Sequence, residues 1–206
     1  MTLELVLAIC LAYLVGAIPL GYVAGKVCRG IDIRDYGSGA TGATNTLRTV
    51  GVWPAVMVLV GDVGKGMAAV LLARLLVESR WAEAGAAVAA IVGHNWPVYV
   101  GFKGGRGVNT SLGAFVAIVP GVALVSAGVA LATIAISRYV SLGSMLGVVS
   151  GFLIMLPLYI LGRQPAEYLA YSLVMATFVL FQHRGNISRL LSGTERRLGE
   201  KAEGVP

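Results

Sequence analysis

The stretch GVNTSLGAFVAIVPGVALVSAGVALATIAIS, residues 107–137, decides the fold of this chain of 206 residues. It contains no charged residue, so it is more stable in a bilayer than in water. The stretch is too long for one comfortable span, and Pro120-Gly121 near its centre predicts a turn. We therefore expect a hairpin of two short membrane helices.

The composition of the whole chain agrees with a membrane protein. Hydrophobic residues make up 57% of the sequence and charged residues 13%, and the mean hydropathy is +0.81. A soluble domain carries about 25% charged residues, so a soluble fold is excluded. We expect a single integral-membrane domain over residues 1–206. The net charge of +6 does not indicate a nucleic-acid partner, because the cations lie in short loops and in the C-terminal tail.

The first apolar run, residues 3–25, has the charge pattern of an uncleaved span. Glu4 stands at its start, where a secretion signal would carry Lys or Arg, and Lys26 and Arg29 follow it. Since cytoplasmic loops are enriched in Lys and Arg, this pattern predicts that the N-terminus lies outside the cell.

Further apolar runs give an all-α polytopic membrane protein with about seven transmembrane helices, counting the short hairpin segments, and a cytoplasmic C-terminus. The expected segments are residues 3–25, 50–77, 84–100, two within 107–137, 145–161 and 168–182. A five-span arrangement, in which residues 107–137 cross once, keeps the same termini and remains open.

The lysines and arginines support this orientation by the positive-inside rule. Lys65 is expected to be buried, and Arg74, Arg80 and Arg163 to lie outside. The other twelve are expected inside: Lys26, Arg29, Arg34, Arg48, Lys103, Arg106, Arg138, Arg184, Arg189, Arg196, Arg197 and Lys201.

Two other pairs of residues have simple interpretations. Cys10 and Cys28 lack the spacing of metal ligands, so we expect no disulfide, no metal and no cofactor.

Asp62 and Lys65 are three residues apart and share one helical face, which favours an ion pair. We interpret this pair as structural rather than catalytic.

Four polar patches fall on the predicted inner side, at residues 38–48, 94–110, 141–144 and 183–195. Each patch alone fits helix capping or membrane anchoring. Together they bring many hydroxyls, amides and cations to one side with few carboxylates, which predicts a site for anions. Its centre is a glycine-rich cationic turn in which backbone N–H groups and cations hold phosphate; the residues are Lys103, Gly104, Gly105, Arg106 and Gly107.

The sequence argues against two kinds of chemistry. It has no Gly-x-Ser-x-Gly nucleophile motif, and it has no paired carboxylates or metal-ligand cluster. Electrostatic and positional catalysis is what remains.

Three ordered motifs resemble the signature loops of the bacterial acyl-phosphate:glycerol-3-phosphate acyltransferase family, PlsY. They are Gly37-Ser38-Gly39-x-x-Gly42-Ala43-Thr44-Asn45-x-x-Arg48, Gly93-His94-x-x-Pro97 with Phe102-Lys103-Gly104-Gly105-Arg106-Gly107-Val108-x-Thr110, and His183-x-x-Asn186-Ile187-x-Arg189-Leu190-x-x-Gly193-x-Glu195. The chain departs from the family pattern at Ala40, Arg106 and Asn109.

The resemblance implies transfer of a fatty acyl group from acyl phosphate to the sn-1 hydroxyl of glycerol 3-phosphate. The products would be 1-acyl-sn-glycerol 3-phosphate (lysophosphatidate) and phosphate, at the first step of bacterial phospholipid synthesis. It implies a multi-pass protein of the bacterial inner membrane whose site faces the cytoplasm. Membrane lipid is an expected partner, whereas nucleic acid, acyl-CoA and acyl carrier protein are not.

The resemblance also implies roles for individual residues. Ser38 and Arg48 serve the chemistry by orienting the acyl phosphate, and His183 and Asn186 position the attacking hydroxyl or stabilise the oxyanion. The phosphate-binding set is Thr44, Asn45, Lys103, Gly104, Gly105, Arg106, Gly107 and Ser141. Asp62, Lys65 and Glu195 are expected to be structural.

The identity of the general base stays open, because neither His94 nor His183 has a neighbouring carboxylate in the sequence. The departing phosphate is one hypothesis for the proton acceptor. Two other functions also stay open at this point: a transporter for organic phosphates, which would need a similar basic site, and a membrane scaffold without catalysis.

Overall fold

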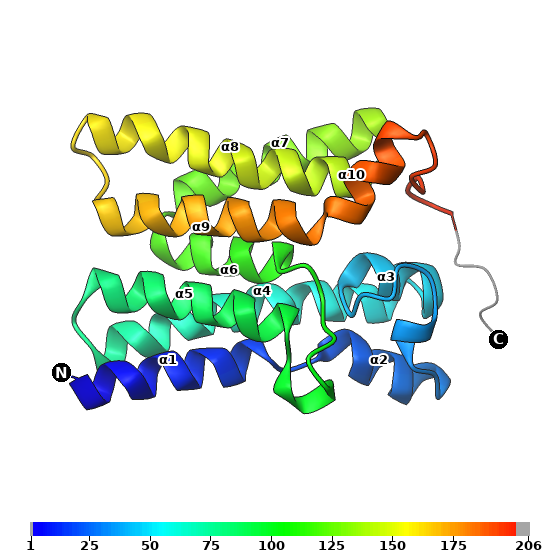
Figure 1. Cartoon of the computed structure of the whole chain (residues 1–206), viewed down its shortest axis with the longest axis horizontal. Coiled ribbons are helices and arrows are strands. Elements are labelled where there is room, and N and C mark those ends of the chain that lie inside the picture. The colour runs from blue at the N-terminus through cyan, green and yellow to red at the C-terminus, as the bar shows by residue number, and fades with distance from the viewer. Residues whose placement is uncertain (1, 201–206) are drawn as a thin grey trace.

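The computed structural model describes residues 2–200, and over those residues the fold is entirely helical (Figure 1). Lys201, which was expected on the inner side, lies outside the described residues. The elements are α1 (Thr2–Gly16), α2 (Leu20–Arg29), η1 (Ile33–Asp35), α3 (Ala43–Thr49), α4 (Val52–Leu76), α5 (Arg80–Asn95), η2 (Val98–Val100), α6 (Val108–Ile118), α7 (Pro120–Ser137), α8 (Val140–Ile160), α9 (Ala166–Gln182) and α10 (Arg184–Leu191).

The long helices run back and forth between the two ends of the molecule (Figure 1). The turns between α4 and α5 and between α8 and α9 lie at the end where α1 begins. The elements α2, α3 and α10 and the loop between α7 and α8 lie toward the opposite end, and the loop before α6 lies between them and the middle of the molecule. The irregular segments of the predicted polar patches are therefore in the same half of the molecule.

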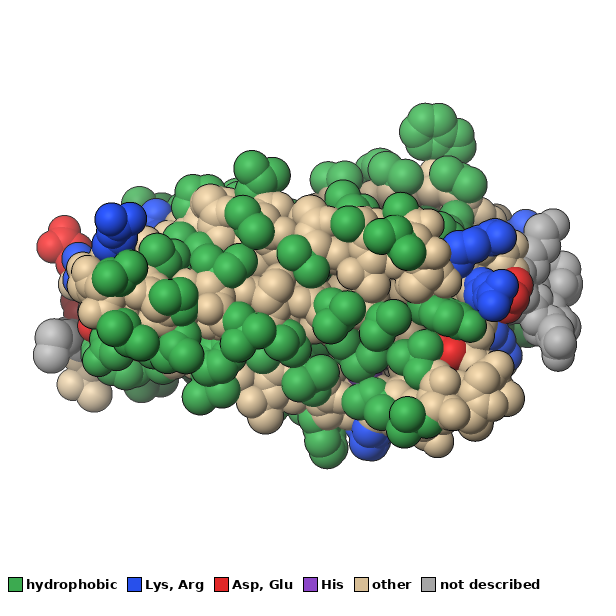
Figure 2. Space-filling view, turned by 90° about the horizontal axis from the view of Figure 1, so that it is seen from above, with side chains coloured by type: hydrophobic (Ala, Val, Ile, Leu, Met, Phe, Trp, Pro, Cys, Tyr) green, Lys and Arg blue, Asp and Glu red, His purple; other side chains and the backbone are tan. Residues whose placement is uncertain are grey.

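Four helical stretches among residues 2–200 are long and apolar enough to cross a bilayer: Thr2–Arg29, Val52–Leu76, Pro120–Ser137 and Val140–Ile160. Two shorter apolar helices are α6 and α9. Figure 2 shows apolar side chains along one face, with charged side chains gathered toward the two ends. The number of spans and the side on which each terminus lies stay predictions.

Prolines account for several of the boundaries. The expected hairpin is confirmed: α6 ends at Ile118, Pro120 is the first residue of α7, and the two helices pack together. The first apolar run was expected to be one helix, but Pro19 divides it into α1 and α2. A proline lacks the N–H that a continuous helix requires, and it disfavours helical geometry in the residue before it. Pro97 likewise ends α5 at Asn95, five residues before the expected boundary.

Two other expectations needed correction. The expected membrane segments 3–25 and 50–77 left residues 26–49 as the connection between them, but α2 continues to Arg29 and the connection contains η1 and the short helix α3. The crossing expected to begin at Met145 is α8, which begins at Val140 and therefore includes Ser141 and Ser144. Hydropathy did not reveal η1, α3 or the polar first turn of α8, because short polar helical segments carry no long apolar stripe.

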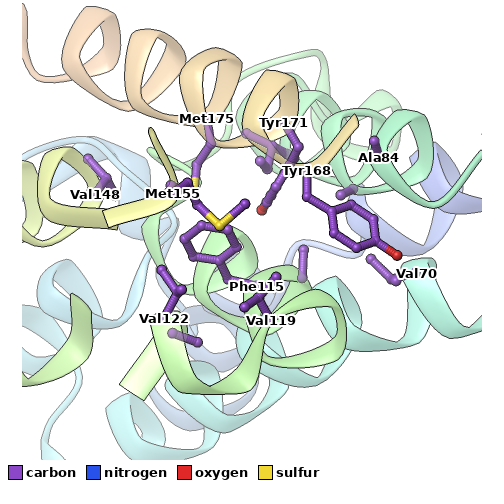
Figure 3. Packing of buried hydrophobic residues seen from close by; sticks show 14 of the residues in the cluster. Val70, Ala84, Phe115, Val119, Val122, Val148, Met155, Tyr168, Tyr171 and Met175 are labelled. Carbon is purple, nitrogen blue, oxygen red and sulfur yellow. The ribbon is translucent and has the colours of Figure 1, made fainter. Parts of the chain in front are cut away.

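The interior has two apolar clusters. In the first cluster, Phe115 and Tyr171 pack edge to face, with ring centroids 5.5 Å apart, and Met155 and Met175 pack around them (Figure 3). The Tyr171 hydroxyl donates to the Ser111 carbonyl at 3.0 Å, so α9 is tied to α6. A second cluster, built mainly from alanines, joins α1, α4 and α5. Small side chains let these helices approach closely, which is the usual basis of packing in lipid.

The contact between α4 and α6 gives a matched test of this packing. A Cβ on Gly66 would collide with the Thr110 backbone, whereas a Cβ on Gly64, in the same helix, meets nothing within 4 Å. We expect Gly66→Ala to destabilise the protein by about 1–3 kcal/mol through overpacking. Gly64→Ala should stabilise it by up to about 1 kcal/mol, because alanine favours helix more than glycine does. Thermal unfolding in one detergent measures both, and shifts of the same sign would contradict the packing.

Candidate functional site

A polar cavity of about 620 Å³ lies where the loops meet. Its lining includes six cationic side chains and a single carboxylate, that of Glu195. An excess of cations around a hollow of this kind favours anionic ligands. The lining residues are Gly37, Ser38, Gly39, Ala40, Arg48, Asn95, Phe102, Lys103, Gly104, Gly105, Arg106, Gln182, Arg184, Gly185, Asn186, Arg189, Thr194, Glu195 and Arg196.

A second cavity, of about 360 Å³, has a mainly apolar lining surface, to which side chains of α4, α6, α7 and α8 contribute. We call it the apolar groove. Leu59 of α4 and Leu131 of α7 line it and are exposed on the outer surface, so the groove reaches the face that contacts lipid. Thr44, Asn45, Gly107, Ser141 and His183 are among its polar lining residues.

The polar cavity and the apolar groove share a wall made of Ser38, Ala40, Arg48, Arg106 and Glu195. Three of these residues come from the first loop and α3, one from the loop before α6, and one from the tail. A molecule with an anionic head and an apolar tail could place its head at this junction and its tail in the groove. Of the predicted site residues, only Lys65 lines neither cavity.

Asn45 organises the first loop. Its Oδ1 accepts from the Ser38 N–H at 2.9 Å, and its Nδ2 lies within 3.0 to 3.2 Å of the carbonyls of Ile33, Tyr36 and Ala40. This fully buried side chain therefore holds Ser38 in place. Substrate binding by Asn45 stays a prediction, and these bonds do not support it.

The glycine turn differs from the expected phosphate cradle. The Gly104 N–H donates to the Asn95 carbonyl at 3.2 Å, and the Gly105 N–H donates to the His94 carbonyl at 3.0 Å. These two amides are used within the protein, so the bonds do not support the expected contact of Gly104 and Gly105 with phosphate, which stays a prediction. Since the first-turn amides of an α-helix have no partner within the helix, the start of α6, which follows Gly107, is where this turn offers donors.

Glu195 joins three parts of the site. Its Oε1 accepts from the Ser141 Oγ at 2.7 Å and from the Asn186 Nδ2 at 2.6 Å, and its Oε2 accepts from the Arg189 Nε at 2.8 Å. Burial raises the pKa of this carboxyl, but the three donors outweigh burial and leave the pKa below its usual value. The contacts agree with the structural role expected for Glu195, and they engage the Ser141 hydroxyl that was expected to contact phosphate.

The two arginines at the junction are partly desolvated. Burial lowers the pKa of Arg106 to about 10, and it also lowers the pKa of Arg48, while the charge of Glu195 opposes both shifts. Both side chains therefore remain cationic at neutral pH. A partly desolvated cation interacts more strongly with an anion than a fully solvated one does.

His183 is 1% exposed and lies near enough to Arg106 for the two to interact electrostatically. Its Nδ1 is 2.8 Å from the Val179 carbonyl, which can only accept, so Nδ1 carries the proton and Nε2 does not. Burial and the charge of Arg106 lower the pKa of His183 to about 4. The side chain is a neutral acceptor of hydrogen bonds and a weak base.

The ion pair predicted between Asp62 and Lys65 is present, with 2.8 Å between the Asp62 Oδ1 and the Lys65 Nζ. His94 joins this pair, since its Nδ1 lies 3.4 Å from the same carboxylate oxygen. This carboxylate neighbour of His94 was not expected from the sequence. Gln182 also lines the polar cavity but lies outside the four predicted polar patches, and Asn95 and Thr194 lie inside those patches but had been given no role.

These features define a helical membrane protein with a cationic chamber next to an apolar groove. Residues 6–193 match the family described as "Glycerol-3-phosphate acyltransferase". Curated relatives with that name include one from Synechococcus, 45% identical over 98% of this chain and all of the relative, and one from Halalkalibacterium halodurans, 44% identical over 93% and 94%.

Solved structures are similar over the same range. The glycerol 3-phosphate form of PlsY, described as an integral membrane glycerol 3-phosphate acyltransferase, is 39% identical with a TM-score of 0.87 over 95% of this chain and 96% of that chain. Its lysophosphatidic acid form is 38% identical with a TM-score of 0.84, over 95% of both chains.

The chain belongs to the glycerol-3-phosphate acyltransferase family. It is an all-helical, multi-pass membrane enzyme that acylates glycerol 3-phosphate, as the three sequence motifs implied. The transporter and scaffold alternatives are thereby set aside.

The charge state of His183 can be measured directly. We expect its imidazole to titrate near pH 4, and so to be neutral above about pH 5 and cationic only below it. NMR of protein labelled at histidine would follow this titration, with the resonance assigned by its loss in His183→Gln. A midpoint near 6.5, the value of a solvated histidine, would contradict the burial described here.

Proposed function

We propose that the acyl donor is acyl phosphate and that the acceptor oxygen is the sn-1 hydroxyl of glycerol 3-phosphate. The observation that carries this proposal is the wall shared by the polar cavity and the apolar groove, where Ser38, Arg48 and Arg106 lie. An acyl phosphate has its reactive carbonyl next to its phosphate, at the boundary between a charged head and an apolar tail. The boundary between head and tail in the acyl phosphate therefore matches the wall between the polar cavity and the apolar groove.

The acceptor is proposed to enter the polar cavity. Lys103 and Arg106 would neutralise its phosphate, and the first-turn amides of α6 would donate to the phosphate oxygens. Gly104, Gly105 and Gly107 contribute by leaving room for that approach. The glycerol 3-phosphate form of the similar PlsY structure supports this acceptor.

The donor is proposed to occupy the junction and the apolar groove. Its tail would lie between α4 and α6 on one side and α7 and α8 on the other. Arg48, which also donates to the Arg196 carbonyl at 3.3 Å, would bind the phosphate of the donor next to the Ser38 hydroxyl. Thr44 and Ser141 line the groove near this head, and we keep both as candidate phosphate contacts.

The reaction needs little from the protein beyond position and charge. The sn-1 oxygen forms a bond with the acyl carbon, and the bond from that carbon to the phosphate oxygen breaks. The departing phosphate takes the hydroxyl proton, giving lysophosphatidate and inorganic phosphate. The low pKa of His183 makes it a poor base, so we assign His183 to orienting the hydroxyl, from which its Nε2 can accept, and Asn186 to orienting the hydroxyl or stabilising the oxyanion.

The setting is proposed to be the bacterial inner membrane, with the site on the cytoplasmic side and residues 1–206 acting as one domain. The support is the charge distribution: the loops of the site carry most of the lysines and arginines, and the opposite end carries Arg74, Arg80 and Arg163. No acyl-CoA or acyl carrier protein is expected to take part.

A reconstitution assay tests the donor. Purified protein in lipid should form lysophosphatidate from glycerol 3-phosphate and acyl phosphate, with release of inorganic phosphate in equal amount. The same protein given acyl-CoA or acyl carrier protein loaded with the same acyl chain should form none. Product from either of those donors, or none from acyl phosphate, would contradict the proposal.

Lys103→Ala tests the acceptor site. Loss of a charge-assisted contact to phosphate should raise the KM for glycerol 3-phosphate by about ten- to a hundredfold with a smaller effect on kcat. Arg163→Ala removes an exposed cation at the opposite end and is the control. An unchanged KM in Lys103→Ala would remove Lys103 from this role.

His183→Gln tests the proton acceptor. Glutamine keeps a polar side chain but cannot serve as a base, so measurable turnover should remain if the departing phosphate takes the proton. Steady-state rates together with binding of both substrates would decide the question. Complete loss of turnover with both substrates still bound would contradict the proposal and favour His183 as the base.

A further inference from the structure

The glycine turn rests on the C-terminal end of α5. The carbonyls of His94 and Asn95 accept the N–H groups of Gly105 and Gly104. A Cβ on Gly105 would collide with the His94 ring, and a Cβ on Gly107 would press on the Asn95 side chain. The glycines are therefore required by close contact with α5, and the His94 ring is the surface beneath Gly105.

The His94 ring is fixed from its other side by a buried ion pair. Its Nδ1 lies 3.4 Å from the Asp62 carboxylate, which also binds the Lys65 Nζ at 2.8 Å. Lys65 in turn donates to the Ile18 carbonyl at 3.0 Å, at the break between α1 and α2. Asp62, Lys65 and His94 are all at most 6% exposed.

This cluster touches the turn but not the polar cavity. Gly105 lines the polar cavity, whereas Asp62 and His94 line the apolar groove and Lys65 lines neither. Contacts from elsewhere, the Gln182 Nε2 to the Gly105 carbonyl and the Thr41 N–H to the Gly104 carbonyl, are long, at 3.4 Å each. The Gly107 carbonyl accepts from Ser111 of α6 at 2.6 Å, whereas the firmest support of Gly104 and Gly105 comes from α5.

We propose that His94, held by Asp62 and Lys65, is a positioning residue that fixes the glycine turn in the geometry that binds the phosphate of glycerol 3-phosphate. This inference rests on the proposed function of the turn. Lys65 neutralises Asp62, so the carboxylate can sit behind the turn without adding net negative charge near an anionic substrate. The pair thus has a functional reason for its place as well as a structural one.

The first test is the variant His94→Asn. The asparagine amide can still reach toward Asp62, but it leaves the space beneath Gly105 empty. We expect the KM for glycerol 3-phosphate to rise about tenfold, and to rise more than the KM for acyl phosphate, because His94 supports the glycine turn directly but is only one of the residues that line the apolar groove. His94→Gln extends to the place of Nε2 and should restore the KM to within about threefold of the natural enzyme.

A double-mutant cycle tests the contact itself. Gly105→Ala alone should raise the KM for glycerol 3-phosphate about tenfold or more, because its Cβ meets the His94 ring. In the His94→Asn background the same change should add less than about twofold, because the space has been vacated. The paired variant Asp62→Asn with Lys65→Met removes both buried charges together and should raise the same KM without leaving an unpaired charge.

The control lies on the same two helices at the opposite end. Glu83 of α5 accepts from Arg74 of α4 at 2.7 Å. The pair Glu83→Gln with Arg74→Met should lower the unfolding temperature but leave the KM for glycerol 3-phosphate unchanged, and Gly105→Ala should have its full effect in that background.

The outcomes are distinct. Equal effects of Gly105→Ala in the natural and His94→Asn backgrounds, or an unchanged KM in His94→Asn, would overturn the positioning role while natural protein still forms lysophosphatidate. If His94→Asn does not fold, the same decision rests on His94→Gln and on the paired Asp62 and Lys65 variant. Natural protein that forms no product from acyl phosphate would instead overturn the proposed function.

Discussion

A backbone in lipid must satisfy its polar groups internally, and the rest of this structure depends on that constraint. Helices meet it along most of the length of the molecule, and the longer irregular segments gather in the half that carries the site. At the end that carries the site, the loops satisfy one another: the Asn45 side chain binds the first loop, and the carbonyls of His94 and Asn95 bind the glycine turn. The loops that line a cavity rich in donors and cations can therefore be ordered beside lipid, because these backbone groups have hydrogen-bond partners within the protein.

The site separates two kinds of surface that its substrates combine. Cations dominate the polar cavity, and the single carboxylate in its lining, Glu195, is engaged by Ser141, Asn186 and Arg189. Because that charge is already paired, it repels an incoming phosphate less than a free carboxylate would. The apolar groove begins at the same wall, so head and tail of one amphiphile can be held at once.

Much of the fold followed from the sequence because apolar length and proline position are local properties. The hairpin at Pro120 and the gathering of the polar loops in one half of the molecule were both predicted. The division of the first run at Pro19 and the short helix α3 were not, because hydropathy does not register short turns. Contacts between distant residues, such as Ser141 with Glu195 and His94 with Gly105, depend on packing, and no local pattern encodes them.

The central claim is that loops distant in sequence form one site on one side of a membrane, and labelling of single cysteines tests it most directly. Ser38→Cys, Lys103→Cys, Arg184→Cys and Arg163→Cys would each be made after replacing Cys10 and Cys28, which are exposed and free. A reagent that cannot cross the bilayer should label the first three from the same side of sealed vesicles and Arg163→Cys only from the other. Labelling of Ser38→Cys and Lys103→Cys from opposite sides would contradict the account.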